Sequence, residues 1–261
     1  MPTSNPTPDS APDPDNELRL ESDWDNLFLQ QSWPKPFVFD ESVVQVFDDM
    51  VSRSIPFYRE VMLSATQWTL NYVQPQTAIV DVGCSTGTFL ELVGRLLDHP
   101  AKLIGLDTSE PMLKQAAVKL TAVEKKHSVQ LVQTSADAHE FANCSVVVMN
   151  YTLQFLPVKQ RRSLLKNIYR GLEPGGLLFL TDKVISPWPQ LQETITQHYE
   201  RFKAKNGYAQ REIERKKEAL ENVLIPLTEA QLRDMLTSSG FRQIDSLIKR
   251  HNFTTFIALK E

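Results

Sequence analysis

The chain has 261 residues, of which 41% are hydrophobic and 23% charged, which suits a globular protein with one large core. A formal net charge of −4 and a pI of about 5.8 argue against a protein whose main function is to bind nucleic acid. The two cysteines form no CxxC pair, which indicates a reducing compartment. No apolar run approaches the roughly 18 residues that would span a bilayer, so we expect no membrane segment.

The chain begins with a segment rich in proline and aspartate. Residues 1–22 carry too few apolar side chains to offset the entropy lost on ordering them. We therefore expect a disordered acidic tail followed by one domain at residues 23–261. The segment also lacks the basic start and apolar stretch of a secretory signal, so we expect a cytoplasmic protein.

Two helices are predicted first, followed by alternating strands and helices. Asp40 can cap a helix whose apolar side chains recur on one face until Pro56 interrupts it, and a second helix is predicted over 58–73. Beyond these, short apolar runs alternate with helical patterns, which is typical of βαβ units and a parallel sheet. The predicted strands are 78–82, 103–106, 129–133, 145–150 and 177–180, and the intervening helices are 86–97, 111–124 and 158–172.

The pattern changes after the fifth strand. Residues 190–223 are predicted to form a heavily charged helical insertion, and 228–238 a helix that ends at Gly240. The last strands, 244–249 and 253–259, are joined by a connection too short for a parallel crossover, so they form an antiparallel hairpin. The predicted fold is α/β and Rossmann-like: a mostly parallel seven-stranded sheet with a C-terminal antiparallel hairpin. Extra helices lie at the N-terminus and between strands five and six.

The turn after the first strand points to a class of ligand. Asp81, Gly83 and Gly87 have the spacing D-x-G-x-x-x-G, and Asp107 ends the next strand. Gly83 permits a positive φ, and we expect a side chain at Gly87 to crowd the strand. Open α/β sheets bind ligands outside the carboxyl ends of their strands, where a carboxylate such as that of Asp107 can accept both hydroxyls of a ribose.

Three interpretations of this turn are open: a dinucleotide site, an S-adenosyl-L-methionine (SAM) site and a purely structural turn. A dinucleotide site prefers G-x-G-x-x-G, which the G-C-S-T-G sequence here lacks. D-x-G-x-x-x-G followed by an acid at the end of strand two is typical of SAM sites, so we favour SAM as the cofactor. The histidines show no metal-ligand spacing, and we predict no metal site.

With the turn, Asp107 and the LEPGG sequence at 172–176, the chain resembles a class I SAM-dependent methyltransferase. Further stretches resemble one subfamily, the carboxy-SAM synthases. In that subfamily the sulfonium methyl of SAM loses a proton and captures the carbon dioxide that prephenate releases on becoming phenylpyruvate. The product, carboxy-SAM, feeds the modification of a tRNA wobble uridine. The stretches are FDESVVQVFDDMVSRSIPFYREV (39–61), VVMNYTLQFL (147–156), NGY (206–208) and ALENVLIP (219–226).

The resemblance implies a set of residues that contact SAM. Tyr58 would touch its amino-acid part, the G-C-S loop its methionine portion, and Asp107 and Thr108 its ribose. Asn150 would face the reacting centre. The predicted SAM contacts are Tyr58, Asp81, Gly83, Cys84, Ser85, Gly87, Asp107, Thr108, Ser135, Ala136 and Asn150.

The chain departs from the subfamily at two positions. Ser135 stands where the subfamily has an acidic residue that binds the adenine, and the nearest acidic residue is Asp137. Lys217 stands where the subfamily has an arginine that binds the new carboxylate from a neighbouring subunit, which implies a homodimer. Lysine keeps the charge but loses the bidentate fork. Asn150 and Lys217 are the candidate catalytic residues.

Two enzymatic functions are open. The first is a carboxy-SAM synthase that acts on SAM and prephenate. The second is an ordinary SAM-dependent methyltransferase that uses the same scaffold on an unidentified small-molecule acceptor. A SAM-binding protein without catalysis is a third interpretation, because a fold does not fix a function. The acidic balance gives no reason to expect direct binding to nucleic acid.

Overall fold

The computed structural model describes residues 39–261, so the predicted tail at residues 1–22 lies outside the described residues. The strands are β1 (Ala78–Val82), β2 (Lys102–Asp107), β3 (Ser128–Gln133), β4 (Cys144–Asn150), β5 (Leu172–Ile185), β6 (Leu227–Thr228), β7 (Gln243–Arg250) and β8 (Phe253–Leu259). The helices are α2 (Glu41–Ser54), α3 (Tyr58–Tyr72), α4 (Thr88–Leu96), α5 (Glu110–Leu120), α6 (Val158–Gly171), α7 (Pro189–Lys205), α8 (Gln210–Ala219) and α9 (Glu229–Ser239). Short 3₁₀ helices are η3 (Ala136–Ala138) and η4 (Leu153–Phe155).

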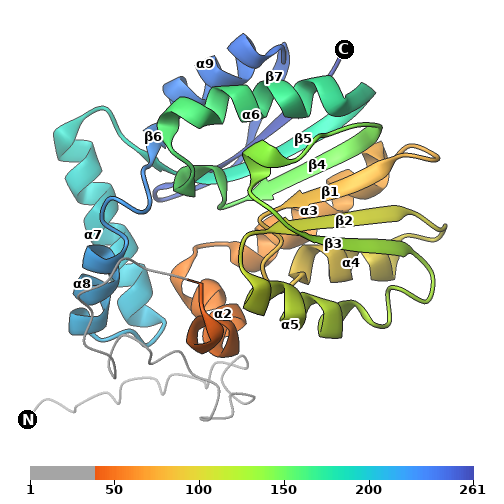
Figure 1. The fold of residues 1–261 in the computed structure, drawn as a ribbon. Coiled ribbons are helices and arrows are strands. Elements are labelled where there is room, and N and C mark those ends of the chain that lie inside the picture. Colours follow the sequence, from red (N-terminus) through yellow and green to blue (C-terminus); the bar gives the residue numbers. More distant parts are fainter. Residues whose placement is uncertain (1–38) are drawn as a thin grey trace, which may run out of the picture.

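The strands form one sheet in the order β3-β2-β1-β4-β5-β8-β7, and the two-residue β6 pairs with β5 (Figure 1). Strands β1 to β5 pair in parallel, whereas β8 pairs antiparallel with both β5 and β7. The predicted α/β Rossmann-like fold with a C-terminal antiparallel hairpin is therefore confirmed. Strand order reverses between β1 and β4, which is where open sheets of this kind bind ligands.

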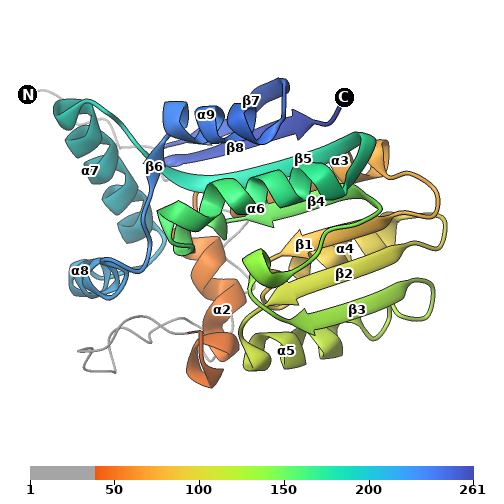
Figure 2. The same cartoon turned by 45° about the horizontal axis from the view of Figure 1, so that its top comes forward.

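Helices cover both faces of the sheet and bury two apolar layers (Figure 2). Successive strand side chains point to opposite faces, so each central strand contributes to both layers. No helix of the described chain, residues 39–261, has the length and apolarity to cross a membrane. The layer under α6 and α9 contains Val80, Met149 and Leu178, and the layer under α3, α4 and α5 contains Ile79, Val148 and Phe179.

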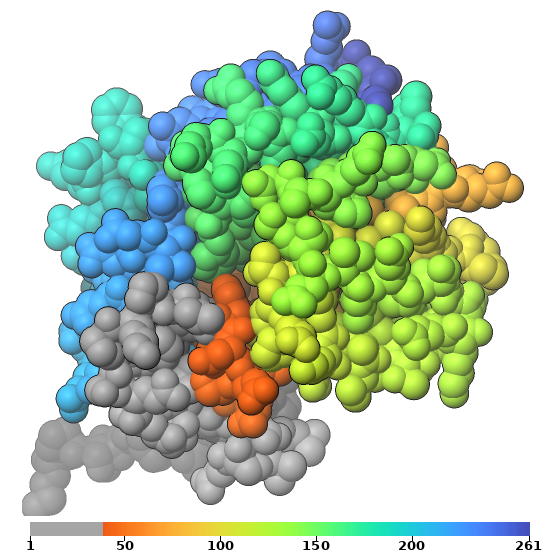
Figure 3. Space-filling view, viewed as in Figure 1, coloured from red at the N-terminus to blue at the C-terminus, as the bar shows by residue number. Residues whose placement is uncertain are grey.

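The first described helix, α2, begins as predicted. The side chain of Asp40 accepts hydrogen bonds from the backbone amides of Ser42 and Val43, at 3.0 and 3.3 Å. This cap satisfies amides that have no partner inside the helix. The helix ends at Ser54, two residues before Pro56. In the space-filling view α2 lies beside α5 (Figure 3), and it contacts α3, α5 and α7.

Strand five is longer than predicted. The expected strand covered 177–180, whereas β5 runs from Leu172 to Ile185. Asp182 and Lys183 are charged and were expected to lie outside the strand. They stay in it because they pair with Thr254 and Phe253 of β8. The extension carries Lys183 past the end of β4, where Asn150 pairs with Thr181 of β5.

The insertion predicted over 190–223 consists of two helices, α7 and α8. Gly207, with a φ of +88°, follows the end of α7 and permits the change of direction. Tyr208 then packs inward, with the Arg53 guanidinium 4.4 Å and the Lys216 ammonium 5.2 Å from its ring centre. These contacts hold the insertion beside α2 at one end of the sheet (Figure 1).

A fully buried arginine on α6 anchors the loops that reach the ligand-binding edge. Arg161 donates to the backbone carbonyl of Gln154 at 3.0 Å and to that of Ile225 at 2.8 Å. The side chain of Gln154 in turn donates to the Tyr151 carbonyl at 3.0 Å and accepts from the Lys183 amide at 2.9 Å. Arg161 therefore fixes η4, and η4 fixes the ends of β4 and β5.

Candidate active site

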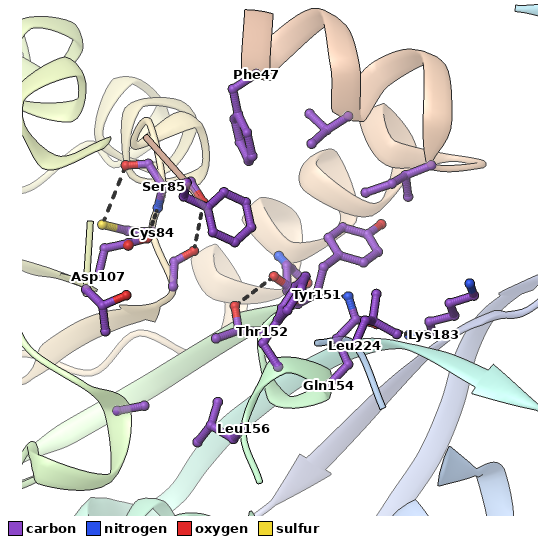
Figure 4. A pocket seen from close by; sticks show the side chains of 18 of the residues that line it. Phe47, Cys84, Ser85, Asp107, Tyr151, Thr152, Gln154, Leu156, Lys183 and Leu224 are labelled. Atoms are coloured by element: carbon purple, nitrogen blue, oxygen red, sulfur yellow. Dashed lines mark hydrogen bonds between the residues drawn. The ribbon is translucent and has the colours of Figure 1, made fainter. Parts of the chain in front are cut away.

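The carboxyl ends of β1, β2, β4 and β5 open onto one cavity of about 400 Å³, which α2, α3, α7 and α8 also line (Figure 4). The structure thus has a cavity at the edge of the sheet where the sequence predicted a ligand site. Of the predicted residues, Gly87 and Lys217 do not line the cavity. Those that do are Tyr58, Asp81, Gly83, Cys84, Ser85, Asp107, Thr108, Ser135, Ala136 and Asn150.

The turn after β1 presents backbone to this cavity. Gly83 has a φ of +77°, and a Cβ added there would lie 2.1 Å from Oγ1 of Thr152. The amides of Gly83 and Cys84 both donate to the carbonyl of Leu106, at 2.8 and 2.9 Å. Ser85 follows with a φ of +48°. No side chain fits at position 83, so the glycine keeps this wall open to a ligand.

Gly87 has a different role from the one expected. It is the N-cap of α4 with a φ of +78°, and a Cβ there would lie 3.1 Å from Cβ of Ala116 and 3.3 Å from Cδ1 of Leu120. Both residues belong to α5, so the expectation that a side chain would crowd the strand is wrong. Gly87 allows α4 and α5 to pack closely behind the turn.

Asp107 ties the turn after β1 to the end of β2. Its carboxylate accepts hydrogen bonds from the backbone amides of Ser85 and Ser109, each at 2.9 Å. Burial raises the pKa of Asp107, while these amides and that of Thr108 lower it. A carboxylate has about four lone-pair sites, so two ribose hydroxyls can still bind here.

Asp81 at the end of β1 and Cys84 in the turn are buried titratable groups. Burial, with a further contribution from Asp107, raises the pKa of the Asp81 carboxyl to about 8. Burial and the charges of Asp81 and Asp107 raise the pKa of the Cys84 thiol. A thiol in this state is a poor nucleophile, so the role of Cys84 lies in its backbone. Among residues 39–261, no three His, Cys, Asp or Glu side chains form a group that could hold a metal ion.

The wall after β3 contains an acid two residues beyond the position where one was expected. Ser135 and Ala136 line the cavity, and so does Asp137 in the first turn of η3. An acid therefore reaches this wall although Ser135 replaces the expected one.

Two neighbouring side chains at the end of β4 lack partners. The amide nitrogen and oxygen of Asn150 and the hydroxyl of Tyr151 are buried without a hydrogen bond in the described structure. An unsatisfied buried polar group costs about 1–3 kcal/mol, which a ligand could offset. Tyr151 also has a φ of +59°, a rare backbone conformation of the kind that clusters at functional sites.

A row of aromatic rings leads from the SAM end of the cavity to a lysine that the sequence analysis missed. Tyr58 stacks on Tyr151 at 6.0 Å, and Phe253 lies 5.9 Å from Tyr151 and 5.5 Å from Tyr199. The ammonium of Lys183 is 5.4 Å from the centre of the Tyr199 ring. In Figure 4, Lys183 lies across the cavity from Ser85 and Asp107. The available signal was the position of Lys183 just after a buried strand.

Lys217 lies outside this cavity. Its side chain is 71% exposed, and its ammonium is 3.7 Å from a carboxylate oxygen of Glu200. The neighbouring Lys216 does line the cavity, and its ammonium is 3.3 Å from the hydroxyl of Ser54. The insertion therefore brings a lysine to its own chain's site, but it is not the lysine that the sequence indicated.

The glycine turn, the acid at the end of β2 and the sheet order are those expected of the class I methyltransferase fold. Residues 79–176 match the family model described as a methyltransferase domain. Human N-acetylserotonin methyltransferase, solved with SAM, shares the fold with a TM-score of 0.57 and 15% identity, over 84% of this chain and 55% of that one. An O-methyltransferase family protein from Burkholderia thailandensis gives 0.58 and 14%, over 90% and 66%.

Curated relatives identify the family. A carboxy-S-adenosyl-L-methionine synthase from Trichodesmium erythraeum is 60% identical over 246 residues, which cover 94% of this chain and 97% of that protein. One from Desulforapulum autotrophicum is 40% identical over 238 residues, 90% of this chain and 96% of that protein. The chain belongs to the carboxy-S-adenosyl-L-methionine synthase family. It is a SAM-dependent transferase, as the sequence predicted.

The first prediction concerns Asp107. Asp107→Ala should weaken SAM binding by about 1.5–3 kcal/mol, or roughly 10- to 150-fold, because a charged acceptor is lost. Isothermal titration calorimetry measures the affinity. Asp98→Ala is the matched control, since that carboxylate is 94% exposed and does not line the cavity. Wild-type SAM affinity in Asp107→Ala would defeat the assignment.

The second prediction separates function from stability at Asn150. Asn150→Ala should lower the rate of SAM conversion while leaving the melting temperature unchanged or higher, since the amide has no partner to lose. Asn143→Ala is the control. It removes a 2.9 Å hydrogen bond to the Gln76 carbonyl and places alanine at a φ of +50°, so it should lower the melting temperature only. Unchanged turnover in Asn150→Ala contradicts the prediction.

Proposed function

We propose that the chain converts SAM and prephenate into carboxy-SAM, phenylpyruvate and water. The observation that carries this proposal is the 60% identity to a carboxy-SAM synthase over almost the whole of both chains. The shape and charge of the cavity support it. Beyond the SAM turn, the lining continues through aromatic rings to Lys183 and Lys216, which suits a ring-bearing acid.

The bonds of this reaction balance without an oxidant. The methyl carbon of SAM loses a proton and forms a bond to carbon dioxide. Prephenate loses that carbon dioxide and a hydroxide as its ring becomes aromatic, and the proton and hydroxide form water. Negative charge develops on oxygen, and the Asn150 amide and Tyr151 hydroxyl are unpartnered donors in the cavity lining.

The SAM contacts follow the same assignment. We propose that Tyr58 contacts the amino-acid part, that the G-C-S turn above Asp81 holds the methionine portion, and that Asp107 and Thr108 bind the ribose. Ser135, Ala136 and Asp137 lie on the wall where the adenine would sit. The positive φ angles, the close approach of Thr152 to Gly83 and the cavity lining support these roles.

The third prediction tests the reaction. Purified protein incubated with SAM and prephenate should release phenylpyruvate and form a nucleoside heavier by one carboxyl group, as mass spectrometry would show. Incubation with SAM alone is the control. If prephenate is not consumed, the synthase assignment fails. The ordinary methyltransferase would then stand, and its product would be a methylated small molecule.

We propose further that the protein is a cytoplasmic homodimer in which Lys217 meets the new carboxylate in the neighbouring subunit's cavity. The exposed position of Lys217 on α8 supports this arrangement. Trp188 and Leu191, 66% and 56% exposed at the start of α7, offer apolar surface for a partner. Cys84 and Cys144 are free and buried, which suits a reducing compartment.

The fourth prediction tests that arrangement by complementation. Lys217→Met and Asp107→Ala chains should each be weakly active alone, and mixing them should restore activity. A mixed dimer then has one cavity with an intact Asp107 and an intact Lys217 from its neighbour. Lys217→Arg should be at least as active as wild type, because its guanidinium can bind the carboxylate bidentately. No recovery on mixing, or a monomer in light scattering, excludes a role across subunits.

A further inference from the structure

We propose that Lys183, at the end of the aromatic row, binds a carboxylate of the second substrate, a ring-bearing carboxylic acid. Lys203, whose ammonium lies over the same Tyr199 ring, adds positive charge to this subsite. This inference rests on the proposed function, because it names how the same cavity recognises the partner of SAM. It concerns residues of β5 and α7, whereas the positions considered so far for the new carboxylate lie on α8.

Lys183 is held in place, and its ammonium forms no ion pair with a described residue. Its backbone amide donates to the Gln154 side chain at 2.9 Å, which fixes the end of β5. Its side chain lines the cavity, and its ammonium has neither an ion pair nor a hydrogen bond to a residue in the range 39–261. Its close contact is the face of Tyr199, 5.4 Å away, which stabilises a cation only modestly.

More cations surround Lys183 than local carboxylates offset. Lys203 of α7 is 6% exposed, and its ammonium lies 4.6 Å from the centre of the same Tyr199 ring. Lys217 approaches from α8, and its ammonium pairs with Glu200 at 3.7 Å. Burial first, then the neighbouring charge of Lys217, lower the pKa of Lys183, while the charge of Glu200 raises it. The half-buried ammonium of Lys183 and the buried ammonium of Lys203 form no ion pair with a described residue, which is unfavourable, so this end of the cavity favours an anion.

The aromatic row defines the rest of the ligand. Tyr58, Tyr151, Phe253 and Tyr199 line the cavity as a continuous wall between the SAM turn and Lys183. The hydroxyl of Tyr199 donates to the Ser54 carbonyl at 2.9 Å, which holds its ring in place. Such a wall packs against a flat or nearly flat ring, and the lysine at its end receives a carboxylate.

Binding of an anion at this subsite should be coupled to proton uptake. Burial first, then the charges of Lys216, Lys183 and Lys217, lower the pKa of Lys203 to about 7, while Glu200 raises it. At pH 8 Lys203 is therefore largely neutral. A bound carboxylate favours its charged form and raises its pKa, so a proton is taken up. Below pH 6 Lys203 is already charged, and the uptake disappears.

The fifth prediction uses binding rather than turnover. Full-length protein saturated with S-adenosylhomocysteine, which has no methyl group to react, is titrated with prephenate and separately with phenylpyruvate by calorimetry at pH 8. Wild type should bind both acids. Lys183→Met should weaken both by at least about tenfold while its affinity for SAM stays at the wild-type value. Lys183→Arg should retain binding of both acids.

Two controls make the result specific. Lys125→Met removes an exposed lysine that does not line the cavity and should bind the acids like wild type. Repeating the titration in buffers of different ionisation enthalpy measures proton uptake, which should be present in wild type and absent in Lys203→Met. If Lys183→Met does not fold, as judged by its melting temperature, Lys183→Gln replaces it.

Each outcome decides between the two proposals. If wild type consumes prephenate but Lys183→Met and Lys183→Gln bind both acids normally, the subsite is wrong and the proposed function stands. If the acids bind in a Lys183-dependent way but prephenate is never consumed, the subsite stands and the proposed function fails. If wild type binds neither acid, the subsite is overturned. Loss of SAM affinity in Lys183→Met would assign the lysine to SAM instead.

Discussion

The hydrogen bond from the Ser85 amide to the Asp107 carboxylate is the interaction on which the proposed SAM end of the cavity depends. It fixes the turn after β1 against the end of β2. The next residue, Thr86, donates to Asp48 of α2 at 2.8 Å, and the Lys119 ammonium of α5 binds the same carboxylate at 2.7 Å. The turn, α2 and α5 therefore form one hydrogen-bonded unit around the predicted ribose and methionine positions. Loss of the Asp107 carboxylate would loosen a loop as well as remove a ligand contact.

Much of the fold could be predicted because its central strands are short, apolar and bounded by glycine or charge. The prediction was wrong where tertiary pairing overrides local composition. Asp182 and Lys183 lie beyond the end of the predicted strand. They stay in β5 because they pair with Thr254 and Phe253 of β8, which are 72 and 70 positions away in the sequence. Asn206 and Gly207 do indicate that the insertion divides into two helices, because glycine is common just after the end of a helix.

The two ends of the cavity differ in the same way: one is built from residues close in sequence, the other from residues far apart. The SAM end comes from residues close in sequence, so its spacing could be recognised as a motif. The opposite end combines Tyr151, Lys183, Tyr199 and Phe253, which lie on four separate segments of the chain. They meet because β4, β5 and β8 are neighbours and because Tyr199 of α7 packs on Phe253 of β8. A single lysine after a strand has no pattern of its own. The sequence therefore indicated the cofactor well and left the recognition of the second substrate to the structure.

Charge explains why this second end should be cationic. SAM brings a positive sulfonium into a cavity that already contains Lys183 and Lys216. Two like charges 8 Å apart repel by about 2 kcal/mol at an effective dielectric constant near 20. Methyl transfer would destroy the sulfonium, whereas carboxylation keeps it, so the repulsion persists through the whole reaction unless an anion offsets it. In the proposed reaction prephenate brings two carboxylates, and one of them would become the carboxylate of carboxy-SAM. In the proposed reaction that carboxylate passes to the methyl carbon of SAM, where Lys217 of the neighbouring subunit would meet it. The carboxylate that phenylpyruvate keeps would stay at Lys183, so each of the two negative charges has a lysine to offset it.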